Sequence, residues 1–270
     1  MLGAVLALCA CVATTAHAAA IRDAASFTGN SLAANDDGST GLVNLGFTAN
    51  FYGNSFTQTY VNNNGNVTFN GPLSTFTPFN LTPASTTRII AAFFADVDTR
   101  GAGSSLVTYG TATLNSRQVF GVNYINVGYF AAQDDKLNSF QLLLTERSDV
   151  AAGDFDIEFN YDRVLWETGS ASGGTNGFGG TSAGVGFAAG NGVDAFQLAG
   201  SLVNGALLDG GPNALISNRL NSNVDGRYIF NVRNGTIIVP PSPVIPVPGA
   251  LVLMLSGITL VGAMARRRKT

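Results

Sequence analysis

Apolar and polar residues alternate along several short stretches of the chain. The clearest example is Phe155-Asp156-Ile157-Glu158-Phe159-Asn160-Tyr161, in which the odd positions are apolar and the even positions polar. A period of two places successive side chains on opposite faces of a β-strand. We therefore expect a strand here, with its odd positions in the core and Asp156 and Glu158 on the face where solvated charges ordinarily lie.

Further strands are expected where β-branched and aromatic residues gather between turn signals such as Asn-Gly and Gly-Gly. One follows the dipeptide Asn64-Gly65, which suits the positive φ angles of a hairpin turn. The predicted strands are Asn66–Asn70, Arg88–Phe94, Leu106–Tyr109, Val119–Val127, Phe155–Tyr161, Ser139–Glu146, Gly184–Ala188 and Arg227–Val232.

No segment between the two ends of the chain has a convincing helical pattern. Many short strands joined by Gly-rich connections favour an all-β fold, an antiparallel β-sandwich-like domain over residues 19–236. The segment Gly169–Gly192 is rich in glycine up to Val185, so most of it is expected to be a long surface loop.

The first 18 residues read as a signal peptide. An apolar run ends at Ala16-His17-Ala18, the A-x-A pattern of a signal peptidase site, although no Lys or Arg precedes it. The mature chain is then expected to begin near Ala19. A buried first helix is the alternative interpretation.

The C-terminal end changes in texture. Residues 237–248 carry five prolines, which favours a stiff, extended linker, and residues 249–270 form an apolar stretch with a basic end. The uncharged run Ala250–Ala265 spans about 24 Å as a helix, and adding the residues from Val244 onward makes it long enough to cross a membrane. The basic cluster Arg266, Arg267, Arg268 and Lys269 would keep that end cytoplasmic.

Composition excludes several classes of chemistry. The only cysteines, Cys9 and Cys11, and the only histidine, His17, lie in the predicted signal peptide. The rest of the chain therefore lacks the usual ligands for zinc, haem and iron–sulfur sites, and it must fold by burial rather than by disulfides. Four of the 14 basic residues sit in the tail, so ten face 17 acidic ones, and we expect no nucleic-acid partner.

Asp96 and Asp98 are the candidate metal ligands. The run Asp96-Val97-Asp98-Thr99-Arg100-Gly101 resembles the opening of a calcium loop, with carboxylates at alternate positions and glycine sixth. Arg100 stands where an oxygen ligand is expected, and Val107 stands where the twelfth-position Glu would be. A shallow calcium site with ligands from other loops is one reading. The other is that the pair ends a strand and caps the next turn, with Arg100 as its counter-charge. We expect no other cofactor.

Two catalytic interpretations and one sugar-binding interpretation each have a simpler structural alternative. Gly180-Thr181-Ser182-Ala183-Gly184 matches a hydrolase elbow, but after residue 18 no histidine is available as its base. The paired carboxylates of a glycosidase could come from Asp156, Glu158, Asp162 and Glu167. Trp166 could stack on a sugar, although a buried core position is the better interpretation.

The tail resembles the PEP-CTERM sorting signal of Gram-negative, exopolysaccharide-producing bacteria. The resemblance rests on the order of a Pro-rich turn, an apolar helix and an Arg cluster at the end of the chain. Pro246-Val247-Pro248 replaces Pro-Glu-Pro, as in glutamate-free variants of the signal. The resemblance implies recognition by an exosortase, transient anchoring in the cytoplasmic membrane and removal of the tail. A plain single-span anchor is the alternative.

The middle of the chain resembles the nidogen-like (NIDO) extracellular domain over roughly residues 45–210. Phe94 stands where members commonly have tryptophan. The segments that carry the resemblance are Val61–Phe69, Phe76–Phe79, Ile89–Arg100, Asn138–Gln141 and Phe159–Tyr161. The resemblance implies an extracellular adhesion or matrix module without catalytic residues.

These observations together predict an exported, non-enzymatic protein of the cell surface or matrix. Its expected partners are an exosortase-type processing enzyme, exopolysaccharide or other matrix proteins. The alternative is a secreted carbohydrate-binding or carbohydrate-active protein that uses the acidic strand face and the Gly-rich loop.

Overall fold

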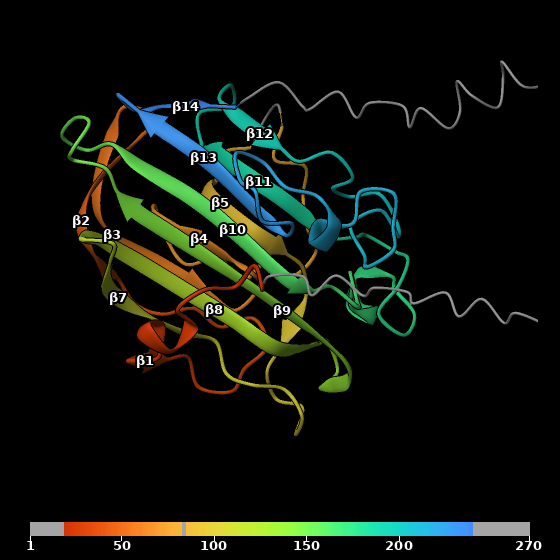
Figure 1. The fold of residues 1–270 in the computed structure, drawn as a ribbon. Coiled ribbons are helices and arrows are strands. Elements are labelled where there is room, and N and C mark those ends of the chain that lie inside the picture. The colour runs from red at the N-terminus through yellow and green to blue at the C-terminus, as the bar shows by residue number, and fades with distance from the viewer. Residues whose placement is uncertain (1–18, 83–84, 240–270) are drawn as a thin grey trace, which may run out of the picture. The chain divides into compact units, whose positions relative to one another are not determined.

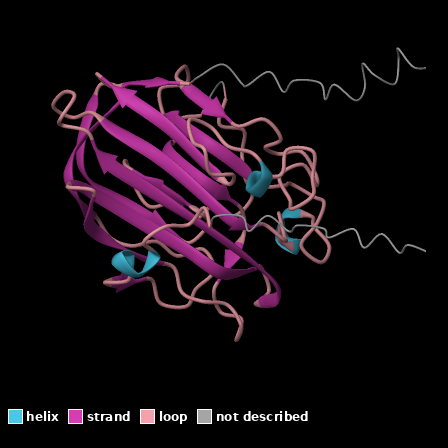
Figure 2. Ribbon diagram, in the orientation of Figure 1, coloured by secondary structure: helices cyan, strands magenta, loops and turns pink. Residues whose placement is uncertain are grey.

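The computed structural model describes residues 19–82 and 85–239, and this part of the chain is built from two antiparallel β-sheets (Figures 1 and 2). The all-β prediction is confirmed. Only three short 3-10 helices interrupt the strands of the described residues: η1 (Ala24–Phe27), η2 (Ser170–Ser172) and η3 (Leu215–Ser217).

The larger sheet has the order β1-β7-β8-β9-β10-β13-β14, with β6 paired to β8. The long hairpin of β8 and β9 forms its centre, next to β10 (Figure 1). Its strands are β1 (Asn30–Ser31), β6 (Val97–Asp98), β7 (Thr108–Leu114), β8 (Arg117–Tyr129), β9 (Gln133–Glu146), β10 (Phe155–Arg163), β13 (Arg227–Arg233) and β14 (Thr236–Ile238).

The smaller sheet has the order β12-β11-β5-β4-β3-β2. The apolar run of β5 is buried on both faces, one against the larger sheet and one against the segment around Leu73–Leu81. The strands are β2 (Val43–Phe51), β3 (Asn54–Asn62), β4 (Asn66–Thr68), β5 (Arg88–Phe94), β11 (Gly184–Ala189) and β12 (Ala195–Gln197).

Most predicted strands are confirmed, and β5 has the predicted bounds. The strand expected at Leu106–Tyr109 begins two residues later and runs to Leu114. The sequence reading missed β2 and β3. In β2, buried Leu45, Phe47, Ala49 and Phe51 alternate with exposed or half-buried positions, but Asn and Gly fill the outer face and weaken the strand signal.

The core lies between the sheets. The odd positions of β10 point into it as predicted, and Trp166 is fully buried there, with its Nε1 donating to the carbonyl of Val127 at 3.0 Å. Trp166 is therefore a core residue, as the preferred interpretation had it.

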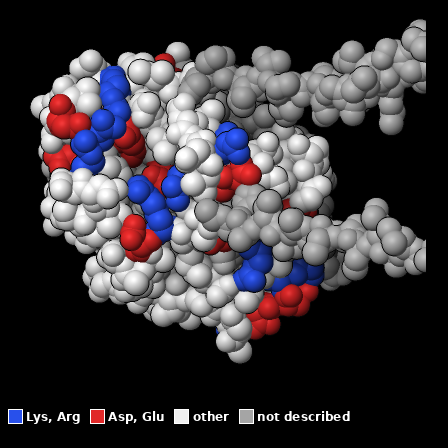
Figure 3. Space-filling view, viewed as in Figure 1, with Lys and Arg blue, Asp and Glu red and all other residues white. Residues whose placement is uncertain are grey.

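The outer face of β10 corrects one expectation. Glu158 is not a solvated charge, because the N-terminal segment Ala19–Ser31 crosses this face and buries it. Phe27 of η1 packs on Val119 and Leu143, and Arg22 lies 2.7 Å from Glu158. Figure 3 shows basic and acidic side chains next to one another on one face of the molecule. On the outer face of the larger sheet, Asp156 forms ion pairs with Arg147 and Arg233.

The last described strand ends at Ile238, and the compact unit extends to Val239. The predicted signal peptide, most of the predicted linker and the whole apolar tail lie outside the described residues. Within residues 19–82 and 85–239, no helix is long and apolar enough to cross a membrane.

Candidate functional site

Two turns and a strand end meet where the two sheets connect. The Asn64-Gly65 turn joins β3 to β4 as predicted, and Asp96 lies between β5 of the smaller sheet and β6 of the larger one. The loop Asn35–Gly38, between β1 and β2, completes the meeting point. Its backbone is pinned by Thr99, whose N–H donates to the carbonyl of Asn35 at 2.9 Å.

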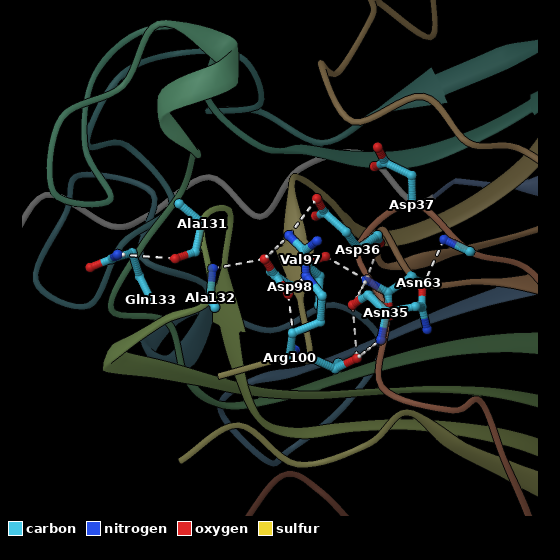
Figure 4. A network of polar contacts seen from close by, with 12 residues as sticks. Asn35, Asp36, Asp37, Asn63, Val97, Asp98, Arg100, Ala131, Ala132 and Gln133 are labelled. Carbon is cyan, nitrogen blue, oxygen red and sulfur yellow. Dashed lines mark hydrogen bonds and ion pairs between the residues drawn. The ribbon is translucent and has the colours of Figure 1, made fainter. Parts of the chain in front are cut away.

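Asparagine side chains hold the loop in place. Asn63 Nδ2 donates to the carbonyls of Asp36 and Val97 (Figure 4). Asn64 Nδ2 donates to Asp37 Oδ1 at 2.8 Å, and its Oδ1 accepts from the N–H of Val97 at 3.0 Å. The Asn-rich turn therefore fixes Asp36 and Asp37 relative to the strand end.

Three carboxylates come together there. One oxygen each of Asp36, Asp37 and Asp96 lies within 4.8 Å of the others. Asp96 is 1% exposed, and neither of its carboxylate oxygens has a hydrogen-bond partner; Oδ1 of Asp36 is also buried and unpartnered. Carboxylate oxygens are the ligands that hard cations such as Ca²⁺ and Mg²⁺ prefer, so this cluster is a candidate cation site.

Burial and like charge act on this cluster in the same direction. Burial, followed by the charges of Asp36, Asp37 and Asp98, raises the pKa of Asp96 to about 7. Burial and the charges of Asp98 and Asp37 raise the pKa of Asp36 to about 6. Without a cation, these two carboxylates therefore stay protonated up to a pH well above the ordinary range for aspartate.

Asp98 has a different environment. Its Oδ1 accepts from Arg100 Nε at 2.9 Å, and its Oδ2 accepts from the N–H of Ala132 at 2.8 Å (Figure 4). Burial by itself would raise the pKa of Asp98, but the hydrogen bonds from Arg100 and Ala132 hold it below its usual value. Arg100 is therefore its counter-charge, as one reading of the sequence expected, and it also reaches Asp36 at 2.8 Å.

Backbone closes the far side of Asp96. A Cβ at Gly169 would lie 2.3 Å from Asp96 Oδ2 and 2.5 Å from the Cβ of Phe130. Only a residue without a side chain fits against the carboxylate here. Asp36 and Asp37 are half-buried, so solvent reaches the cluster from their side.

The structure thus joins Asp96 to Asp36 and Asp37, which the sequence reading did not single out. Asp36 lies 60 positions from Asp96 in the chain, and no motif connects the two. Two local features of the sequence could have indicated these residues. Asn35-Asp36-Asp37-Gly38 has the composition of an acidic turn, and the run Asn62–Asn64 supplies side-chain amides that can bind it.

The other acidic candidates have structural partners. Asp162 accepts from the N–H of Ala20 at 2.7 Å, and Glu167 accepts from the N–H of Gly205 at 2.8 Å. Glu158 lies 2.7 Å from Arg22 and 3.3 Å from Arg227. Asp156 lies 2.7 Å from both Arg147 and Arg233.

The serine of the Gly-x-Ser-x-Gly match leads into a strand rather than sitting on an elbow before a helix. Ser182 is 1% exposed and donates to Asn204 Oδ1 at 2.5 Å. Residues 169–183 form the expected loop apart from the one-turn 3-10 helix η2. The sorting-signal residues Pro246, Pro248, Arg266, Arg267, Arg268 and Lys269 lie outside the described residues.

Comparison with known proteins identifies the domain. The family model described as NIDO related matches residues 12–205. Alpha-tectorin of Mus musculus and of Homo sapiens are each 32% identical over 224 residues, 73% of this chain. Nidogen of Drosophila melanogaster is 34% identical over 132 residues, 40% of this chain.

The chain covers only 10% of the length of each of these relatives. No solved structure matches it. The family match nevertheless covers more than half of the chain, including the Asn-rich turn and the Phe94-Ala95-Asp96 strand end. The chain belongs to the NIDO-related family.

Proposed function

We propose that this protein is an exported, non-enzymatic structural or adhesive module of the bacterial cell surface or exopolysaccharide matrix. The observation that carries the proposal is its membership of the NIDO-related family over residues 12–205. The resemblance to NIDO domains implies an extracellular adhesion or matrix role. An acidic chain that has no cysteine after residue 11 is compatible with that location.

The absence of enzymatic activity is supported by what the acidic and nucleophilic candidates do. Asp156 and Glu158 form ion pairs with arginines, Glu167 organises two loops, and Ser182 is buried. A general acid or nucleophile must reach its substrate. Detectable turnover of exopolysaccharide by the purified chain would contradict this part of the proposal and favour a carbohydrate-active protein.

The tail, in this proposal, is a sorting label. Residues 246–269 keep the protein in the cytoplasmic membrane transiently, an exosortase-type enzyme removes them, and the domain remains in the matrix or on the surface. The order of prolines, apolar run and basic cluster in the sequence supports this assignment.

Intact-mass measurement on protein recovered from the cell surface tests the label. We expect a mass that ends between Val244 and Gly249 and lacks the four terminal basic residues. A mass that extends to Thr270, in protein that fractionates with the cytoplasmic membrane, would show a permanent anchor. Deleting Arg266–Lys269 should block surface delivery, because the orientation cue is lost.

Retention in the matrix tests the adhesive role separately. We expect the processed protein to co-sediment with exopolysaccharide or with other matrix proteins from the same cells. Release into the medium as freely diffusing protein, from cells that process the tail normally, would contradict a structural or adhesive role while leaving the sorting assignment intact.

A further inference from the structure

The carboxylate of Asp96 lacks the partners that a buried charge requires. It is 1% exposed, and both of its oxygens are without a hydrogen bond. A buried, ionised carboxylate without compensation is strongly unfavourable, so native proteins pair such groups or use them to bind metals. Asp96 is neutral while its raised pKa keeps it protonated, and an ionised Asp96 requires a bound cation as its partner.

No basic side chain of the described residues supplies it. Arg100 is the nearest cation of the cluster, but its Nε contacts Asp98 and its Nη2 contacts Asp98 and Asp36. Arg100 thus serves two of the four carboxylates that face one another, namely Asp36, Asp37, Asp96 and Asp98. Asp37 accepts a hydrogen bond from the neutral side-chain amide of Asn64 and has no ion pair among the described residues.

The donor set selects the kind of cation. All three grouped ligands are carboxylate oxygens within 4.8 Å of one another, so one Ca²⁺ ion at its usual ligand distance of about 2.4 Å can contact all three. Mg²⁺ would draw opposing oxygens to about 4 Å and demands a near-octahedral shell. Zinc prefers the ring nitrogens of His and the thiolate of Cys, and the chain has neither residue type after residue 18.

We propose that Asp36, Asp37 and Asp96 bind one Ca²⁺ ion, and that Asp98 is the structural partner of Arg100 beside this site rather than a ligand. Asp96 supplies the buried end of the site, against Gly169. Asp36 and Asp37 close it from the solvent side and leave room for water ligands.

The ion would connect parts of the fold that are distant in sequence. Asp36 and Asp37 belong to the loop between β1 and β2, whereas Asp96 lies where the chain passes from the smaller sheet to the larger one. Calcium would thus fasten the N-terminal loop to the junction of the two sheets. The inference is independent of the proposed adhesive role, since it rests only on this geometry.

Calorimetric titration with CaCl₂ tests the site on the full chain, purified in mild detergent and freed of metal with a chelator. We expect one ion per chain with a Kd on the order of 10⁻⁴ to 10⁻³ M, the range of extracellular calcium modules. Mg²⁺ at the same concentrations should bind at least tenfold more weakly. Absence of binding up to 10 mM Ca²⁺ would overturn the proposal.

Variants locate the ion. Asp96→Asn should weaken calcium binding at least tenfold, and Asp37→Asn at the half-buried rim should weaken it several-fold. Asp149→Asn is the matched control, because it removes an exposed carboxylate that pairs with Arg117 and Arg147 away from the cluster. Its Kd should stay within twofold of the parent value.

Thermal unfolding gives a second measurement, which stays informative if a substitution lowers the stability of the fold. Calcium binds the native state, so Tm should rise with its concentration in the parent chain and in Asp149→Asn. Asp96→Asn should lose this response. It should also melt no lower than the parent in chelator, because it removes an uncompensated charge. A calcium response equal to the parent's in both Asp96→Asn and Asp37→Asn would overturn the assignment.

Discussion

At the residue scale, Gly65 lets the turn after β3 pack directly against the backbone of β5. Its φ is +76°, and a Cβ there would lie 1.8 Å from the carbonyl oxygen of Phe93. The turn after β3 can therefore press against β5 only because residue 65 has no side chain. This contact brings the Asn-rich turn to the strand end that carries Asp96.

Gly53 is a matched control for the loss of stability expected when Gly65 is replaced. Gly53 has φ +77°, and nothing lies within 4 Å of its Cβ position. Gly53→Ala should cost about 1 kcal/mol of stability for the backbone angle alone. Gly65→Ala should cost at least about 2–3 kcal/mol, because the backbone of β5 must also move. Urea unfolding measures both; equal losses would show that the close approach has no energetic weight.

At the scale of elements, the N-terminal segment Ala19–Ser31 completes the larger sheet. It covers the polar face of β9 and β10 through Arg22, whose backbone N–H donates to Gln141 Oε1 at 3.3 Å and whose guanidinium meets Glu158. Phe27 packs beside Gly121, where a Cβ would lie 2.5 Å from its ring. The segment is held by the buried ring of Phe27 and by partly buried polar contacts.

Glu158→Gln tests these polar contacts. Removing the buried charge leaves Arg22 and Arg227 with a weaker partner, and we expect a loss of about 1–2 kcal/mol. Hydrogen exchange should also accelerate at the amides of Ala20 and Ile21, which donate to Asp162 on the same face. Asp149→Asn is the control, because it removes an exposed ion pair with Arg117 and should leave that exchange unchanged. Unaltered exchange in Glu158→Gln would show that the ion pair of Arg22 with Glu158 does not help to hold the segment.

At the scale of the whole molecule, two sets of carboxylates oppose each other in their effect on acid stability. Asp96 and Asp36 have raised pKa values of about 7 and about 6. Between the ordinary value near 3.8 and these values, the folded state holds protons that the unfolded chain has released. Their contribution to stability therefore falls as the pH rises through this window. Asp98 and Asp135 have lowered pKa values, and their contribution is lost below the ordinary value.

In chelator, the full chain should thus be most stable at a mildly acidic pH of about 4–5, and Tm should fall as the pH rises from 5 to 8. Circular dichroism melts across this range measure the effect. Asp96→Asn should flatten the decline, because it removes the carboxylate of the cluster whose pKa is raised the most. A Tm that rises steadily from pH 5 to pH 8 in chelator would contradict the repulsion within the cluster.

The sequence by itself determined the fold class and much of the strand content. Period-two alternation in β10, the apolar run of β5 and the Asn64-Gly65 turn are local consequences of side-chain chemistry, and each formed the predicted element. The lack of cysteine and histidine after residue 18 is likewise a property of composition. It narrowed the chemistry of any site without reference to a fold.

The tertiary structure decided which polar residues meet. The burial of Glu158 depends on a segment more than 130 residues away in sequence, and the companions of Asp96 come from a loop 60 positions earlier. Asp96 and Asp98 are nearly adjacent, yet the guanidinium of Arg100 and the backbone N–H of Ala132 donate hydrogen bonds to Asp98 and not to Asp96. A pattern of residues states what each side chain can bind, but electrostatic energy depends on distance and burial, and only the folded chain fixes these.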